Sequence, residues 1–280
     1  MKKGLSIFFC FVVGELCFGQ ANWDSTRFGF NQEVGRYANI RGFKMYYEIY
    51  GVGQPMLMIH SNGGSMNDLF YQAAFFSKKF RVIMADSRAQ GKSFDESDSL
   101  SYEMMADDMN ALLEFLRVDS CFVLGWSDGG INGLLLAIRH PKMVKKLAIT
   151  GANLWPDSTA VDPWIVKNVV NMYDSVSRLV TTPRTKNFKK LLRLPVYEPH
   201  IKIENLQKLR CPTLVISGDH DVILPRHSML IAESIPNSYL WVVANSGHSI
   251  PLVYQNEFNK VVMEFFSKPF RRIQGKNRFN

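Results

Sequence analysis

The sequence is poor in cysteine: 280 residues carry four, with no C-x-x-C pair and no His/Cys cluster. This excludes a disulfide scaffold and a structural zinc site. No block repeats, and 12 Pro and 19 Gly are too few for a collagen-like or low-complexity chain. With 46% apolar and 21% charged residues, the chain is too hydrophobic to be disordered and too polar to be a bundle of membrane spans. A globular protein remains, and its length favours one α/β domain with an insertion.

One apolar run stands at the start of the chain. Lys2 and Lys3 precede a stretch from Leu5 to Gly14 that is apolar apart from one serine, and the small residue Gly19 follows shortly after. A charged start, a short apolar stretch and a small residue near a cleavage point predict a secretory signal peptide over residues 1–19. The mature protein is then periplasmic or secreted; an uncleaved start is the alternative. The run is too short for a stable transmembrane span.

The rest of the chain alternates between short β-rich runs and amphipathic helical stretches, a pattern typical of a mostly parallel sheet covered by helices. We expect an opening hairpin, then six buried strands, with helices between them. The expected strands are 37–40, 44–50, 56–59, 81–85, 121–124, 147–150, 213–217 and 240–243, and the expected helices are 67–77, 102–116, 129–139 and 252–266. Between Ala152 and Leu209 the alternation breaks into Pro-bounded pieces without buried-strand runs, which predicts a helical cap insertion over about 152–209.

The formal charge of +8 is concentrated at one end of the chain. The tail over about 267–280 holds five Lys and Arg and no acid, and removal of the signal peptide takes away two Lys and one Glu. The body between them is therefore nearly neutral. No recognisable nucleic-acid-binding motif accompanies the charge, so no nucleic-acid partner is expected. Residues 20–280 form a single predicted domain with the cap inside it.

The most specific local pattern is Gly125-Trp126-Ser127-Asp128-Gly129, a G-x-S-x-G directly after an apolar strand and before a helix. A nucleophile elbow needs glycines beside a strained serine because its neighbours are crowded together. The turn lifts the Ser127 hydroxyl out of the sheet and aims the helix N-terminus at it. We predict that Ser127 is a nucleophile, and we expect the neighbouring Trp126 to contact the substrate.

A serine nucleophile needs a base, and the base needs an orienting carboxylate. In this kind of fold the chain order is serine, acid, histidine. Asp221 and His248 follow two successive predicted strands, at the sheet edge where sites in open α/β sheets gather. We predict His248 as general base and then acid, and Asp221 as the group that fixes its tautomer. Asp219 is the competing acid, with shaping of its loop as the other reading.

The reaction also needs an oxyanion hole. The residue after the nucleophile, Asp128, offers one backbone N–H, and the loop after the predicted strand 56–59 offers the second. In that loop, His60-Ser61-Asn62-Gly63-Gly64-Ser65, we assign the donor to the amide of Asn62. This set of residues needs no metal and no organic cofactor. The remaining five histidines are expected to be structural or solvated.

Two other patterns have simpler interpretations. Gly91-Lys92-Ser93 resembles the end of a phosphate-binding loop, but position 86, where the first glycine should be, is Asp86. Cys121 and Cys211 begin two apolar strands, with the strand 147–150 expected between them. Two strand spacings, roughly 9 to 10 Å, are beyond the reach of a disulfide. Both thiols should therefore be free and buried.

Taken together, these pieces resemble the α/β-hydrolase superfamily of serine hydrolases over nearly all of the mature length. The resemblance includes the loop Asp86-Ser87-Arg88-Ala89-Gln90-Gly91-Lys92-Ser93, which matches D-x-R-G-x-G-x-S. It implies the α/β-hydrolase fold with about eight strands. Ser61 and Ala89 depart from it, since each stands where the family has a glycine. Relatives that use an aspartate nucleophile, the epoxide hydrolases and haloalkane dehalogenases, are disfavoured by Ser127.

Within the superfamily, Gly125 to Ile131, Gly151-Ala152-Asn153 and Cys211-Pro212 are similar to the biphenyl hydrolase-like group. That resemblance implies that Asp128 contacts the α-amino group of an α-amino acid ester. A carboxylate beside an oxyanion is costly unless a substrate ammonium offsets it. The alternative is that Asp128 points away and pairs with a cap residue.

The resulting hypothesis is a serine hydrolase that cleaves small carboxylic esters through an acyl-enzyme, with α-amino acid esters as a candidate class. A carbon–carbon bond hydrolase or lactonase on the same three residues is the alternative within enzymes. A hydrolase-fold protein that binds a ligand without turnover is the alternative from another class. The sequence leaves the oligomeric state open.

Overall fold

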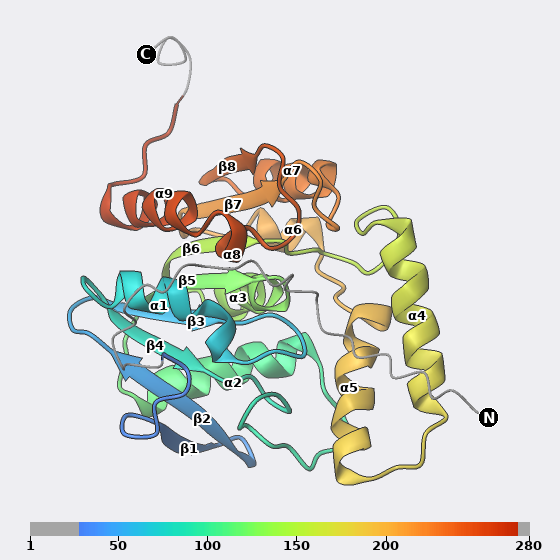
Figure 1. Cartoon of the computed structure of the whole chain (residues 1–280). Helices are drawn as coiled ribbons and strands as arrows, with labels where there is room; N and C mark the ends of the chain where they lie inside the picture. Colours follow the sequence, from blue (N-terminus) through green and yellow to red (C-terminus); the bar gives the residue numbers. More distant parts are fainter. Residues whose placement is uncertain (1–27, 274–280) are drawn as a thin grey trace, which may run out of the picture.

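The computed structural model describes residues 28–273; the predicted signal peptide and the end of the predicted basic tail lie outside them. The described chain builds one eight-stranded sheet in the order β1-β2-β4-β3-β5-β6-β7-β8 (Figure 1). β1 and β2 run antiparallel and the other strands are parallel, so the predicted α/β-hydrolase architecture is confirmed. The strands are β1 (Arg36–Ile40), β2 (Phe43–Tyr50), β3 (Pro55–Ile59), β4 (Arg81–Ala85), β5 (Cys121–Trp126), β6 (Val144–Thr150), β7 (Thr213–Gly218) and β8 (Ser238–Val243).

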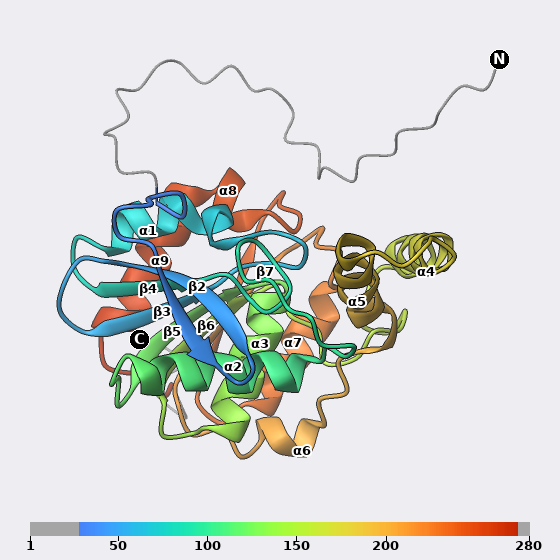
Figure 2. The ribbon, with the colours of Figure 1, turned by 90° about the horizontal axis from the view of Figure 1, so that it is seen from below.

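Helices cover both faces of the sheet, and Figure 2 shows the sheet between them: α1, α8 and α9 on one side, and α2, α3, α6 and α7 on the other. Two further helices, α4 and α5, pack on each other and stand beyond one end of the sheet. The helices are α1 (Phe70–Phe76), α2 (Tyr102–Phe115), α3 (Asp128–Arg139), α4 (Pro163–Ser177), α5 (Pro183–Tyr197), α6 (Ile203–Leu206), α7 (Pro225–Ser234), α8 (Ile250–Val253) and α9 (Gln255–Ser267), with a short 3-10 helix η1 (Met66–Leu69). Among the described residues no helix is long and apolar enough to cross a membrane.

The central strand β5 divides the core into two layers. Its side chains alternate across the sheet, with Cys121 and Val123 in the layer beneath α2 and α3, and Leu124 and Trp126 in the layer beneath α1 and α9. All four are buried. Burial on both faces explains why the strand is a continuous apolar run in the sequence, and it fixes the place from which the Ser127 turn leaves the sheet.

The sheet order confirms the prediction for the cysteines. β6 lies between β5 and β7, so the strand beginning at Cys121 and the chain segment at Cys211 are two strands apart. Both thiols are free and buried. Burial raises the pKa of Cys121 to about 12, so that thiol stays protonated and unreactive at neutral pH.

Three elements differ from the sequence prediction. The expected helix 67–77 is split into η1 and α1, and the expected helix 252–266 into α8 and α9. At the second break Tyr254 leaves helical geometry (φ −114°, ψ 36°), and its hydroxyl donates to the backbone oxygen of Asn245. The strand 240–243 was expected to be buried, but β8 is a sheet edge, and Leu240 and Val242 are 40% and 45% exposed.

Between β6 and β7 the chain forms α4, α5 and α6. Capping side chains begin the first two of these helices: Asp162 accepts from the amide of Trp164, and Thr182 accepts from that of Thr185. Prolines at the first helical position suit those starts. Pro195 is different, since it lies inside α5.

Candidate active site

Ser127 occupies a strained turn between β5 and α3. Its backbone has φ 56° and ψ −119°, a conformation that non-glycine residues rarely adopt. The flanking glycines allow it, because a Cβ at Gly125 would meet the backbone oxygen of Gly129, and a Cβ at Gly129 would meet that of Ile59. The turn therefore has the elbow geometry that the G-x-S-x-G pattern predicts, with the serine at the N-terminus of α3.

His248 lies between Ser127 and Asp221. Its Nε2 is 2.9 Å from the Ser127 Oγ, and its Nδ1 is 2.7 Å from the Asp221 Oδ1. If Nδ1–H donates to the carboxylate, Nε2 is left to accept the serine proton. The Asp221 side chain is fully buried, and its Oδ1 also accepts from the amide of Ile223. The structure thus brings together the three residues that the sequence singled out from separate loops.

Asp219, the competing acid, does not contact the His248 ring. Its two carboxylate oxygens accept from the backbone amides of Asn245 and Ser246, each at 2.9 Å. Hydrogen bonds from His220 and from these amides hold the pKa of Asp219 well below its ordinary value. The geometry agrees with the loop-shaping reading, since the carboxylate holds the segment that leads to His248.

The loop after β3 lies against the start of α3, since a Cβ at Gly129 would be 2.8 Å from the backbone oxygen of His60. Asn62 precedes Gly63, which has φ 71° and donates its amide to the side-chain oxygen of Gln90 at 2.6 Å. The Asp128 amide stands at the first position of α3, where an N–H has no acceptor within its own helix. The two amides assigned to the oxyanion hole therefore belong to a braced loop and to a helix N-terminus.

The two departures from the family pattern are accommodated locally. Ala89 has φ 65°, so alanine occupies the left-handed conformation that the usual glycine adopts freely. The hydroxyl of Ser61 donates to Asp68 Oδ2 at 3.3 Å.

Asp128 is buried beside the predicted oxyanion hole. Burial raises its pKa to about 6, against the lowering effect of hydrogen bonds from the side chains of Tyr102 and Asn62. Its Oδ2 has no hydrogen-bond partner among the described residues. Tyr102 is also buried, and both burial and the Asp128 charge raise its pKa, so its hydroxyl remains a donor. The carboxylate is therefore held by the hydroxyl of Tyr102 and the amide of Asn62, and it forms no ion pair with any residue that the structure describes.

Trp126 lies in a different place from the predicted substrate contact. Its ring is buried in the core layer beneath α9, and its Nε1–H donates to the backbone oxygen of His248 at 2.9 Å. Because residues alternate along β5, the side chain before Ser127 points into that layer. The expectation that Trp126 binds substrate is not supported by this placement; the indole braces the histidine.

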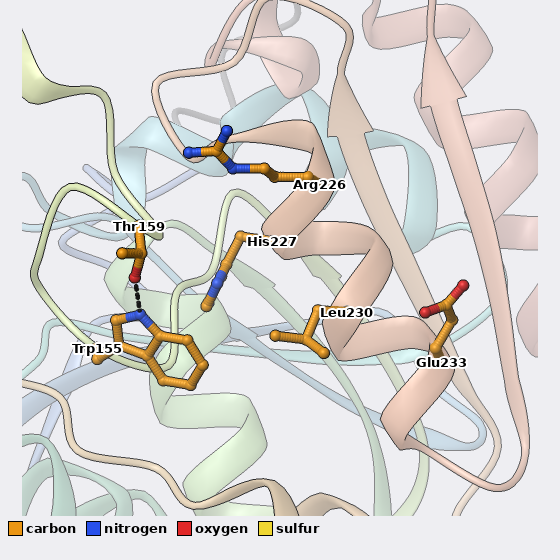
Figure 3. Close-up of a pocket in the computed structure, with 6 residues that line it drawn as sticks. All are labelled: Trp155, Thr159, Arg226, His227, Leu230 and Glu233. Atoms are coloured by element: carbon orange, nitrogen blue, oxygen red, sulfur yellow. Dashed lines mark hydrogen bonds between the residues drawn. The ribbon is translucent and has the colours of Figure 1, made fainter.

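Two other histidines have structural partners, as expected. The amide of Ser87 donates to His60 Nε2, and that of Leu154 donates to His227 Nε2. Burial lowers the pKa of His227 to about 4, so it is neutral at physiological pH. Its ring borders a cavity of about 390 Å³ on the outer side of α7, where Trp155 and Thr159 face that helix (Figure 3). The cavity is lined by Trp155, Thr159, Arg226, His227, Leu230 and Glu233, and none of these belongs to the predicted site.

Sequence reasoning missed three residues of this neighbourhood. Tyr102 begins α2, Gln90 follows β4, and Gly151 follows β6. Each of the three is distant in sequence from the residues that it contacts. The Gly151-Ala152-Asn153 segment did signal a resemblance, but no local pattern connects Tyr102 with Asp128. Only the packing of α2 on α3 brings these two side chains together.

Comparison with known proteins agrees with this fold. The model of the alpha/beta hydrolase fold family matches residues 54–194. The chain is 26% identical over 247 residues to Serine hydrolase BPHL of Mus musculus, covering 81% of this chain and 84% of that protein. It is also 26% identical over 249 residues to Serine hydrolase BPHL of Homo sapiens, with the same coverage. An esterase structure from Thermogutta terrifontis aligns with a TM-score of 0.72 over 85% of this chain and 99% of that one, at 21% identity.

The fold and the family match define the class: the chain belongs to the alpha/beta hydrolase fold family and is a hydrolase. Within that family it is similar to Serine hydrolase BPHL, which agrees with the biphenyl hydrolase-like resemblance of its sequence. The solved esterase supports the fold alone.

Proposed function

We propose that this protein is a serine hydrolase of small carboxylic esters in which Ser127 is the nucleophile. The observation that carries the proposal is the chain of hydrogen bonds from Ser127 through His248 to Asp221. The serine at its end has a positive φ, a strained backbone conformation for a residue with a side chain. A purely structural serine at this turn would need neither the strain nor the buried carboxylate behind the histidine.

The reaction follows from this geometry. His248 Nε2 takes the Ser127 proton as Oγ attacks the ester carbonyl carbon, and the resulting oxyanion accepts from the amides of Asn62 and Asp128. The tetrahedral intermediate collapses, the bond to the alcohol oxygen breaks, and His248 returns the proton to the leaving alcohol. Water then attacks the acyl-enzyme with His248 as base, which releases the carboxylic acid and restores Ser127.

For the substrate we propose α-amino acid esters, with the ammonium group on Asp128. The support is the state of that side chain: a buried carboxylate, one oxygen without a partner, and a pKa raised to about 6. A substrate ammonium would supply the missing cation and offset the cost of a negative charge beside the developing oxyanion. The ionised form needed for this contact dominates above pH 6.

The first experiment measures turnover of a nitrophenyl ester by the wild type and by Ser127→Ala. We expect turnover to disappear while the far-UV circular dichroism spectrum stays the same. Full activity in the variant would remove the proposal. The same panel should include a lactone and a carbon–carbon substrate, since both alternative reactions would use the same nucleophile.

The second experiment compares an α-amino acid ester with its N-acetylated form. The wild type should prefer the free amine by about tenfold to a hundredfold in kcat/KM, the effect of one hydrogen bond to a charged group. Asp128→Asn keeps the backbone N–H and should lose the preference. Asp119→Asn, the same change at an exposed site before β5, is the matched control and should keep it. Equal rates on both esters in the wild type would argue against an ammonium site.

A further inference from the structure

The proline inside the cap helix α5 leaves a backbone oxygen without its usual partner. In an α-helix the carbonyl of residue 191 accepts from the N–H of residue 195. That residue is Pro195, which has no N–H, and it lies within the helical span of α5. A carbonyl released in this way needs a donor from elsewhere, or it loses hydrogen-bonding free energy.

The donor comes from the loop that carries the proposed oxyanion amide. Asn62 Nδ2 donates to the backbone oxygen of Leu191 at 3.2 Å, across 129 residues of sequence. Hydrogen bonding from the same carboxamide acts on Asp128 and on Tyr102. The Asn62 side chain is thus held between the cap and the buried carboxylate, and the backbone N–H of the same residue is the proposed oxyanion donor.

The helix that presents this carbonyl is itself fixed to the domain. Lys190, the residue before Leu191, is buried, and its Nζ lies 2.6 Å from Asp95 Oδ2 and donates to the backbone oxygen of Ser97. Asp95 in turn accepts from Arg88 at 2.9 Å. A buried ion pair of this kind holds its partners in one arrangement, so the Leu191 carbonyl has a defined position relative to the sheet.

On the basis of the proposed ester hydrolysis, we propose that the Leu191 carbonyl, released by Pro195, positions Asn62 for catalysis. Through this contact, the position of the cap helix α5 determines the orientation of one oxyanion donor, the backbone N–H of Asn62. Pro195 is then a positioning residue: it touches neither the substrate nor the reacting atoms. It acts because it has no backbone N–H that could compete with Asn62 for the Leu191 carbonyl. Small misplacements of such donors lower the rate of the chemical step more than they weaken substrate binding.

The variant that tests this is Pro195→Ala, which restores an N–H at residue 195 and lets α5 recapture the Leu191 carbonyl. We expect kcat on the preferred ester to fall about tenfold with KM nearly unchanged. The melting temperature should stay the same or rise, because the substitution removes a helix-breaking residue. Pro163→Ala is the matched control, since Pro163 is the first residue of α4, where no helical N–H is bonded. It should leave kcat unchanged.

A double-mutant cycle with Asn62→Ala shows whether Pro195 acts through Asn62. If it does, Pro195→Ala causes no further loss in the Asn62→Ala background. If the losses in kcat from the two substitutions multiply in the double variant, the inference is overturned. An unchanged kcat in Pro195→Ala would also overturn it. So would a change in KM alone, because Pro195 would then only shape the pocket. Ser127→Ala separates the two claims. Full activity in that variant removes the proposed function and this inference with it, whereas an inactive Ser127→Ala beside a fully active Pro195→Ala removes this inference alone.

Discussion

Gly151 lies directly against the ring of His248. A Cβ built on Gly151 would be 2.5 Å from Cε1 of the histidine and 2.8 Å from its Nδ1, closer than carbon atoms approach in folded proteins. Gly151 also has φ 65°, a conformation that disfavours a side chain. The absence of a side chain at the end of β6 is therefore what leaves room for the imidazole between Ser127 and Asp221.

We predict that Gly151→Ala lowers kcat/KM for a nitrophenyl ester by about a hundredfold, because the ring must move by a substantial fraction of an ångström. Gly42→Ala is the control. Gly42 has φ 84° in the β1–β2 turn, and a Cβ there would meet no atom within 4 Å, so the backbone strain is comparable without the clash. Steady-state kinetics should show nearly full activity for Gly42→Ala. Equal losses in both variants would mean that strain is the cause and not the contact with His248.

The two aspartates of the β7 loop should differ sharply. Asp221→Asn leaves the geometry but favours the wrong histidine tautomer, and we expect kcat to fall by about 10³- to 10⁴-fold. Asp219→Asn replaces one of the two oxygens that hold the loop amides with an NH2 and removes the charge beside His220. The expected loss is about tenfold or less. Steady-state kinetics on the two variants provides the comparison. A larger loss in Asp219→Asn than in Asp221→Asn would reverse the assignment of the acid.

Asp128 should destabilise the folded protein at neutral pH. Its pKa is raised from the ordinary value of 3.8 to about 6, so between these values the folded state holds a proton that the unfolded state has released. Stability therefore falls as pH rises through this window, by about 3 kcal/mol in total. Asp128→Asn lacks this titration.

Urea unfolding at several pH values tests the effect. The stability difference between Asp128→Asn and the wild type should grow in favour of the variant from pH 4 to pH 7 and then level off. A difference that is constant with pH, or that grows in favour of the wild type, would show that burial does not raise the pKa of the Asp128 carboxyl.

The buried and exposed ion pairs on α5 offer a second stability test. Lys190→Met breaks a buried pair with Asp95 and should cost about 3 kcal/mol of unfolding free energy. Lys186→Met removes a pair with the exposed side chain of Asp98 and should change stability little. Chemical unfolding of both variants checks the contrast. Similar losses would show that the Lys190 pair is not held in the interior.

Much of the fold was predictable because its signals are local. The G-x-S-x-G between an apolar strand and a helix determines where the chain turns, and the apolar runs at 121–124 and 213–217 can hardly be placed outside a sheet. The breaks at Tyr254 and between η1 and α1 could not be read in this way, because the hydrophobic spacing continues through them. The exposure of β8 depends on its being at the sheet edge, which follows from strand order.

The site was predictable to the extent that function concentrates at strand ends. Ser127, Asp221 and His248 each follow an apolar strand, and parallel topology brings those ends together. The position of Trp126 beside the serine does not show which face of the sheet its side chain points to. The proposed role of Pro195 could not be read from the sequence, because the contact between Asn62 and the Leu191 carbonyl joins residues 129 positions apart.

The most direct test of the central claim is covalent labelling by an alkyl fluorophosphonate, which reacts with activated serines as an ester does. Intact-mass spectrometry of the wild type should show addition of one phosphonyl group, and peptide mapping should place it on Ser127. Ser127→Ala should remain unmodified, and His248→Ala should react far more slowly. A phosphonyl group on another residue, or equal labelling of Ser127→Ala, would contradict the assignment of Ser127 as the nucleophile.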